Sequence, residues 1–344
     1  MSKPVSKPVS ILVPIRNEAQ YIQRCLDAIA AQDHPELECW IIDGMSDDNT
    51  RSLIAPYLEK HPWMHVLDNP ERTAPYALNY GLEKATGEVI IRVDGHCEIA
   101  SDYVSSCLRV MEESGADCVG GPLVSQGDSA RAEAIAMAMS SPFGVGNARF
   151  RYSQQAAWVD TLAFGAYRRV VFDTVGSFNP ELTRNQDDEF NYRVREAGFL
   201  IYLSPEIRAV YYTRGSFKKL WQQYAGYGLW KVRVMKAYPK SIQMRHLVPG
   251  LFVAGLSGST ALTLIAMLFQ KAGQCHRAPQ LVKKGPLLLK AIVYPYALLG
   301  LLMGVKRTKK QWRYLPDILL SFPILHLAYG SGFWQGVWQS VKRS

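Results

Sequence analysis

Two polar residues that could bind a metal ion follow an apolar run of the chain, at Val93-Asp94-Gly95-His96. A carboxylate at the carboxyl end of a buried strand lies at the edge where open α/β sheets bind ligands. If the chain stays extended, Asp94 and His96 point to the same side, because side chains alternate with period two. A carboxylate oxygen and an imidazole nitrogen at one place suit a divalent cation on a diphosphate. The alternative interpretation is a polar turn built on Gly95.

A second acidic segment, residues 43–50, follows the apolar run 39–42. Asp43 could accept a hydrogen bond from a nucleotide base at the same edge, while the residues after it could cap the next helix. Capping alone is the alternative, and it suits Asp47 and Asp48 better than Asp43. The chain has neither a G-x-G-x-x-G nor a G-x-x-x-x-G-K-[ST] sequence, which argues against dinucleotide-binding and P-loop sites.

The elements that must hold these residues alternate between strand-like and helical patterns from residue 9 to about 123. This alternation favours a mostly parallel sheet covered by helices on both faces, so we predict an α/β nucleotide-binding domain. The expected strands are 10–13, 39–42, 65–67 and 89–93, and the expected helices are 21–31, 49–58, 74–85 and 103–113.

The chain is basic, with a formal net charge of +9 and a pI near 9.2, which indicates an anionic partner. Clusters of Lys and Arg at 231–245 and 306–313 border apolar runs, a pattern typical of membrane proteins and not of nucleic-acid binders. The six cysteines show no paired spacing, so we expect neither a zinc site nor a disulfide framework. Residues 1–10 lack the apolar core of a signal peptide, so the first half is expected in the cytosol.

Three apolar segments near 247–270, 287–305 and 318–338 are long enough to cross a bilayer. We therefore expect a catalytic domain over 1–230 and a helical, membrane-associated region over 231–344. A full crossing by the first segment puts a basic loop outside, against the positive-inside tendency. Re-entrant or interfacial segments are thus an alternative, and a soluble hydrophobic core is another.

Several motifs, taken in order, resemble those of the inverting family 2 glycosyltransferases, which have the GT-A fold. The resemblance covers residues 9–231 closely and is nearest to succinoglycan-type bacterial exopolysaccharide glycosyltransferases. The motifs are Val13-Pro14-Ile15-Arg16-Asn17-Glu18, Ile42-Asp43-Gly44-Met45-Ser46, Asp94-Gly95-His96, Phe164-Gly165-Ala166-Tyr167-Arg168 and Asn185-Gln186-Asp187-Asp188-Glu189-Phe190.

The resemblance implies a UDP-sugar donor lying across the strand ends. Asp43 would hold the uracil, and Asp94 would act as the DxD motif that holds Mg2+ or Mn2+ against the diphosphate. His96 replaces the last Asp of that motif, and the softer imidazole favours Mn2+. In a metal-independent alternative, Arg92 neutralises the leaving group. The implied donor-binding residues are Pro14, Arg16, Asn17, Glu18, Asp43, Ser46, Arg92 and Asp94, and the implied metal ligands are Asp94 and His96.

An inverting transfer needs a carboxylate that takes the proton of the attacking acceptor hydroxyl. The resemblance aligns Asp187 with the Asp of the family's ED motif, and Asp188 and Glu189 are neighbours that could serve instead. The alternative for all three is the acidic first turn of a helix, which the helix dipole favours. Asp160 is a candidate for the acceptor side, or else it makes a strand-start hydrogen bond.

A helix predicted over 216–238 places Gln223, Tyr227 and Trp230 on one face. The resemblance implies that this face stacks on the sugar of the acceptor, as a related Gln-Arg-Trp motif does in processive members of the family. The motif is incomplete here, so a single-addition enzyme is expected. An interfacial helix with aromatic membrane anchors is the alternative.

The sequence thus predicts a membrane-associated inverting glycosyltransferase that extends a polyprenyl-linked saccharide for an exported polysaccharide, with glucose as the guessed sugar. The catalytic domain is expected at the bacterial inner membrane, facing the cytosol. A polysaccharide assembly complex is an expected partner, and no nucleic-acid partner is expected. The alternatives are a polyprenyl-phosphate glycosyltransferase and a non-catalytic nucleotide-sugar-binding subunit.

Overall fold

The computed structural model describes residues 7–213, 215–308 and 310–342, which form two compact units. The first unit comprises residues 1–126 and 148–212, and the second comprises 127–147 and 213–344. This division differs from the expected boundary at residue 230. Helix α9 (Phe217–Ala237) belongs to the second unit because it packs along α13 (Leu315–Lys342).

The first unit is built around an eight-stranded sheet of order β3-β2-β1-β4-β9-β6-β10-β8, with a three-stranded sheet β5-β11-β7 beside it. The four strands predicted from the sequence form its parallel half, β3-β2-β1-β4. The strands are β1 (Val9–Ile15), β2 (Leu37–Asp43), β3 (Met64–Asp68), β4 (Val89–Arg92), β5 (Cys97–Ile99), β6 (Cys118–Gly120), β7 (Leu123–Gly127), β8 (Ala157–Trp158), β9 (Gly165–Arg168), β10 (Ile201–Leu203) and β11 (Ala209–Thr213).

Helices cover both faces of this sheet, as the alternating pattern predicts. Helix α1 shows why: its buried residues Ile22, Cys25, Leu26 and Ile29 recur at the spacing of one helical face. The helices of the first unit are α1 (Ile22–Ala30), α2 (Thr50–Lys60), α3 (Ala74–Lys84), α4 (Tyr103–Ser114), α7 (Arg169–Val175) and α8 (Gln186–Glu196).

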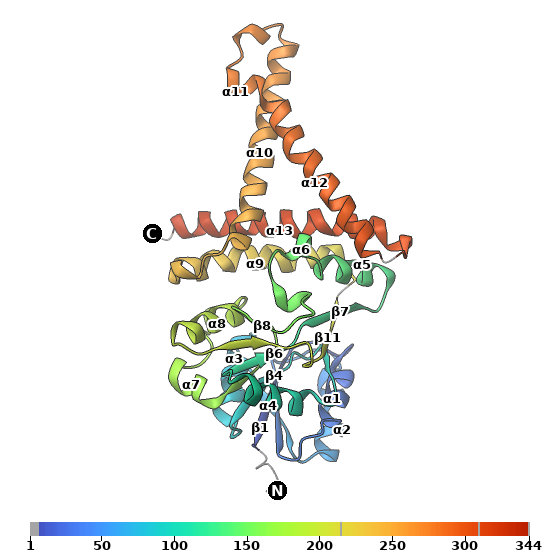
Figure 1. Ribbon diagram of the computed structural model, residues 1–344, viewed down its shortest axis with the longest axis vertical. Coiled ribbons are helices and arrows are strands. Elements are labelled where there is room, and N and C mark those ends of the chain that lie inside the picture. Colours follow the sequence, from blue (N-terminus) through green and yellow to red (C-terminus); the bar gives the residue numbers. More distant parts are fainter. Residues whose placement is uncertain (1–6, 214, 309, 343–344) are drawn as a thin grey trace. The chain divides into compact units, whose positions relative to one another are not determined.

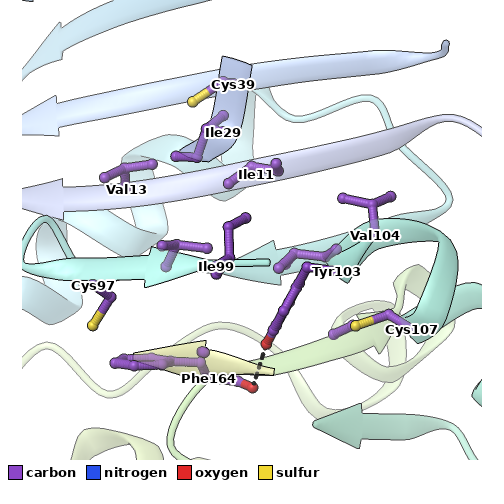
Figure 2. Close-up of a cluster of buried hydrophobic side chains, with 14 of the residues drawn as sticks. Ile11, Val13, Ile29, Cys39, Cys97, Ile99, Tyr103, Val104, Cys107 and Phe164 are labelled. Carbon is purple, nitrogen blue, oxygen red and sulfur yellow. Dashed lines mark hydrogen bonds between the residues drawn. The ribbon is translucent and has the colours of Figure 1, made fainter. Parts of the chain in front are cut away.

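Two apolar clusters, one on each face, hold the sheet in place. In the first, the hydroxyl of the buried Tyr103 of α4 donates to the carbonyl oxygen of Phe164, the residue before β9, at 3.1 Å (Figure 2). In the second, Phe190 of α8 is fully buried against Phe172 and Phe178, with ring centroids 5.0 and 4.5 Å away. The second cluster therefore fixes α8 against the sheet.

The second unit is helical (Figure 1). Its helices are α5 (Ala130–Met139), α6 (Pro142–Val145), α9, α10 (Met244–Lys271), α11 (Gln280–Lys283), α12 (Gly285–Arg307) and α13. Of the described helices, two are long and apolar enough to cross a membrane by length and composition, Met244–Lys271 and Gln280–Arg307. They contain the first two of the three predicted apolar segments.

The third predicted segment lies in α13, which is a packing helix in this structure. Glycines allow its backbone to approach α9 closely: a Cβ atom at Gly332 would lie 1.9 Å from the carbonyl oxygen of Ala225. Ile318, Phe322 and Leu325 are fully buried in the core of the unit. The apolar composition of α13 is thus explained by burial in protein, and apolar length alone does not separate the two cases.

We predict that Phe190→Ala destabilises the first unit strongly, because the cavity left between Phe172 and Phe178 cannot collapse under a rigid sheet. The expected loss in the free energy of unfolding is about 3–5 kcal/mol, measured by urea unfolding. Val170→Ala, which truncates an exposed side chain on α7, is the control and should change stability by less than about 0.5 kcal/mol. Equal losses in the two variants would show that the Phe190 cluster does not hold α8.

Candidate active site

The loops after β1, β2 and β3 form the edge where the sequence predicted the donor site. Each contains a non-glycine residue in the left-handed region, namely Asn17 (φ 56°), Met45 (φ 55°) and Arg72 (φ 61°). Such backbone costs about 1–3 kcal/mol per residue and persists only where neighbouring contacts enforce it. The strain is therefore concentrated at the ligand-binding edge of the sheet.

The loops after β1 and β2 are held together by reciprocal hydrogen bonds. The amide of Asn17 donates to the Ser46 hydroxyl at 2.9 Å, and its side-chain amide donates to Asp47 at 2.7 Å. Asp47 in turn donates its backbone N–H to the Asn17 side chain at 3.0 Å. Arg16 and Asn17 are exposed and Pro14 is half-buried, so the predicted nucleoside-pocket residues line one accessible loop pair.

Asp43 has partners that the sequence analysis did not foresee. Its carboxylate is 1% exposed and accepts from Ser46 and from Nε of Arg51, the latter at 2.5 Å. Arg51 also pairs with Asp68, the neighbour of Asp43 across β2 and β3. The structure therefore shows Asp43 fixing its own loop, and any contact with a base would use a remaining lone pair.

Asp94 is held by a buried arginine at the end of β4. Nε of Arg92 donates to one carboxylate oxygen of Asp94 at 3.0 Å, and Nη2 donates to the other at 3.3 Å. Arg92 is 8% exposed, and its Nη1 is buried without a hydrogen-bond partner among the described residues. Burial lowers the pKa of Arg92, but the charges of Asp94 and Asp187 outweigh it and keep that pKa above its ordinary value. Arg92 is thus bonded to Asp94 and also interacts electrostatically with Asp187.

The chain does not stay extended after Asp94, contrary to the geometry that the alternation argument assumed. The N–H of Cys97 donates to the carbonyl of Asp94 at 3.0 Å, which closes a turn over 94–97. Gly95 fits there because a Cβ atom would lie 2.5 Å from Ile15. The turn alternative is therefore confirmed as backbone geometry, and it gives Asp94 and His96 different partners.

His96 is oriented by Glu18, a residue of the β1 loop. Its Nδ1 lies 3.0 Å from a carboxylate oxygen of Glu18, and the ring packs edge-on against Tyr211. The contact fixes Nδ1–H as the donor, so Nε2 carries the lone pair that a metal ion would take. Within the described part of the chain, no group of three or more His, Cys, Asp or Glu side chains could hold a metal ion. Asp94 and His96 therefore stay predicted ligands, and the donor and water would have to supply the other ligands of a cation bound there.

The acidic segment at the start of α8 divides into two kinds of residue. Glu189 is 1% exposed and pairs with Arg193 at 2.7 Å, which suits a structural role. Asp187 is half-buried, accepts from the N–H of Asp188 at 2.9 Å, and acts electrostatically on Arg92. Asn185, just before the helix, has φ 60°. Asp187 is therefore the acidic residue of this segment that the structure relates to Asp94.

A buried hydrogen-bond chain ties α8 to the Asp160 loop. Tyr167 of β9 donates to Asn191 at 2.9 Å, and Asn191 donates to the hydroxyl of Thr161 at 2.9 Å. Asn191 lies one turn beyond Asp187, and Thr161 follows Asp160. The structure thus brings Asp160 toward the helix of Asp187, and Asn191 is a supporting residue that the sequence analysis missed.

The predicted acceptor residues of α9 belong to the second unit. Gln223 donates its side-chain amide to Tyr227 at 2.8 Å, which confirms that the two share a face. The guanidinium of Arg233 lies 4.0 Å from the centre of the Trp230 ring and covers it. One face of the Trp230 ring is therefore covered by Arg233, so stacking on a sugar would have to use the other face.

Comparisons with known proteins show which family the chain belongs to. Residues 10–176 match the family described as Glycosyl transferase family 2. A Methanococcus voltae protein named dolichyl N-acetyl-alpha-D-glucosaminyl phosphate 3-beta-D-2,3-diacetamido-2,3-dideoxy-beta-D-glucuronosyltransferase is 30% identical, over 67% of this chain and 75% of that protein. The chain belongs to glycosyl transferase family 2. It is therefore an enzyme of glycan biosynthesis, as the motifs predicted.

Two further likenesses extend over nearly the whole glycosyltransferase. The succinoglycan biosynthesis protein ExoA of Rhizobium meliloti (strain 1021) is 27% identical over 94% of this chain and 93% of its own length. The structure of the mannosyltransferase PcManGT from Pyrobaculum calidifontis, in complex with GDP-Man and Mn2+, has a TM-score of 0.57 at 19% identity, covering 98% of this chain and 91% of that one. The predicted GT-A fold is thereby confirmed.

We predict that Arg92→Met destabilises the enzyme by about 1–3 kcal/mol, because it leaves the Asp94 carboxylate poorly solvated and without its cation. Adding Asp94→Asn should recover part of this loss in urea unfolding. The control is Arg208→Met, which breaks an exposed pair with Asp102 and should cost less than about 1 kcal/mol. Equal losses for Arg92→Met and Arg208→Met would contradict the importance of the buried pair.

Proposed function

We propose that this glycosyltransferase transfers a sugar from a UDP-sugar, with inversion, to a hydroxyl of a lipid-linked saccharide. The observation that carries the proposal is the pairing of Arg92 with Asp94 at the carboxyl edge of the sheet, with Asp187 acting on the same guanidinium. Transfer from a diphosphate to a hydroxyl uses a charged group at the leaving diphosphate and a base at the hydroxyl, and Arg92 interacts with the residues proposed for both roles.

In the proposed reaction, Asp187 accepts the proton of the acceptor hydroxyl as that oxygen attacks the anomeric carbon from the face opposite UDP. Arg92 keeps Asp94 in place and adds positive charge near the departing diphosphate. Asp94 and His96 would hold Mn2+ or Mg2+, which when bound supplies positive charge to the leaving group. Glu18 holds the His96 ring, and the loop pair of Asn17 and Ser46 lines the nucleoside.

The proposed acceptor is supported by the relatives and by the second unit. The name of the Methanococcus voltae relative gives its acceptor as a dolichyl-phosphate-linked sugar, and ExoA is named for the biosynthesis of succinoglycan. Two helices of suitable length and composition would keep the enzyme at a membrane that contains such a lipid. We propose the bacterial inner membrane, with the catalytic unit on the cytosolic side, and a polysaccharide assembly complex as its setting.

The first test is donor selection by the purified, detergent-solubilised protein. We expect slow release of UDP from one member of a panel of UDP-sugars, without acceptor and with Mn2+, and loss of that release on adding EDTA. A parallel GDP-sugar panel controls for the nucleotide. Turnover of a GDP-sugar alone would replace the uridine assignment, whereas binding of no nucleotide sugar would contradict the enzymatic proposal.

Asp187→Asn should lower kcat by about 10²–10⁴-fold while leaving UDP affinity unchanged, because it removes the base and keeps the shape of the side chain. Turnover is measured with a lipid-linked acceptor, and UDP affinity by calorimetry. Asp188→Asn, at the adjacent position, is the matched control and should retain most activity. If Asp188→Asn is the inactive variant, the base is assigned to the wrong neighbour.

Glu18→Gln should weaken Mn2+ binding by about 10–100-fold, because an amide holds the His96 imidazole less firmly than a carboxylate does. Free Mn2+ is followed by electron paramagnetic resonance in the presence of UDP. Glu36→Gln, on an exposed loop residue, is the control. Unchanged Mn2+ affinity in Glu18→Gln would mean that His96 does not bind the metal.

A further inference from the structure

Helices α10 and α12 form an antiparallel hairpin in the second unit (Figure 1). The rings of Phe252, in the third turn of α10, and Tyr296, midway along α12, stack at 4.6 Å. Where α12 begins, a Cβ atom at Gly285 would lie 2.6 Å from the backbone of Leu262 and Thr263 in α10. The later residues of α10 contact the earlier residues of α12, so the two helices are antiparallel. The segment that connects them, residues 272–284, forms the tip of the hairpin.

The outer surface of this hairpin is apolar and uncovered by protein. Of the residues in the most apolar part of each helix, only 6% in α10 and 11% in α12 are buried. Leu251, Leu268, Leu287 and Leu298 are each more than half exposed. An exposed apolar surface of this extent needs a partner, and single exposed side chains do not explain it.

The length of the hairpin identifies the partner as bilayer hydrocarbon. Helix α10 has 28 residues, or about 42 Å at 1.5 Å per residue. The hydrocarbon core of a bilayer is about 30 Å thick. No Lys, Arg, Asp or Glu occurs between Arg245 and Lys271, so α10 offers an uncharged stretch that is long enough to cross it.

Both ends of the hairpin are charged, which excludes a tip buried within the membrane. The tip and its borders, residues 271–284, hold four Lys and Arg and no acidic residue. The segments at the base, 231–245 and 306–313, hold ten. Charged groups avoid the hydrocarbon, and the larger basic cluster favours the cytosolic side. Lys290, in the second turn of α12, is the one charged residue in the sequence of 285–305, and side chains on a helix point toward its N-terminus, which for α12 is the tip end.

We infer that α10 and α12 cross the bilayer completely as a two-helix hairpin, with the base on the cytosolic side and the tip in water on the opposite side. The inference rests on the membrane association in the proposed function. It also means that α13 stays on the side of the base, because α13 is occupied by α9 and follows the second crossing in the chain.

Cys275 at the tip reports directly on this topology. It is the exposed cysteine of the described chain, while Cys25, Cys39, Cys97, Cys107 and Cys118 are buried. The full chain in sealed bacterial membranes is treated with a membrane-impermeant maleimide, in spheroplasts and in inverted vesicles. The matched variant is Cys275→Ser with Gln311→Cys, which moves the thiol to an exposed position at the base. Cys275→Ser alone gives the background.

We expect Cys275 to be labelled in spheroplasts only, and the thiol introduced by Gln311→Cys in inverted vesicles only. Labelling of both thiols in the same preparation would overturn the crossing and place the hairpin on one face. The reversed pattern would keep the crossing and overturn the orientation. Extraction of the protein by alkaline carbonate would contradict membrane association itself, whereas UDP binding, measured separately, tests the enzymatic proposal.

Discussion

The buried Arg92 guanidinium is the interaction on which the candidate active site depends. Removing a cation from water costs several kcal/mol, and this cost is offset here only because Asp94 accepts two of its N–H groups and Asp187 adds negative charge. Arg92 ends β4, a central strand of the sheet, so the sheet fixes its position. The loop of Asp94 is therefore fixed by the sheet, and Asp187 at the start of α8 acts on the same guanidinium electrostatically.

The parallel half of the sheet was predicted well from the sequence, because each of its strands and helices has its own apolar pattern within a short stretch of the chain. The four apolar runs became β1 to β4, and helices α1 to α4 begin and end within a few residues of their predicted bounds. Local patterns also misled in one instance. Residues 318–338 have the composition of a membrane span, but glycines such as Gly332 turn that segment into a packing helix, and only the contacts with α9 reveal it.

The site was less predictable, because its contacts join residues far apart in the chain. The family motifs indicated Asp94, His96 and Asp187, but no spacing rule links Glu18 to His96, which are 78 positions apart. Similarly, Arg51 neutralises Asp43 only because a helix begins beside the strand end. The ion pair between Glu189 and Arg193 differs from these contacts, because opposite charges four residues apart on a predicted helix can be recognised from the sequence alone.

The two units carry net charges of opposite sign, which indicates that they have different roles. The first unit holds 18 Lys and Arg against 27 Asp and Glu, whereas the second holds 21 against three. An acidic unit repels a nucleotide diphosphate unless cations are placed locally, which agrees with the roles proposed for the buried Arg92 and for a metal ion. The second unit has the opposite character. In the proposed function its positive charge would attract anionic lipid head groups and lipid-linked phosphates. The overall basic charge of the chain comes from the second unit and not from the first.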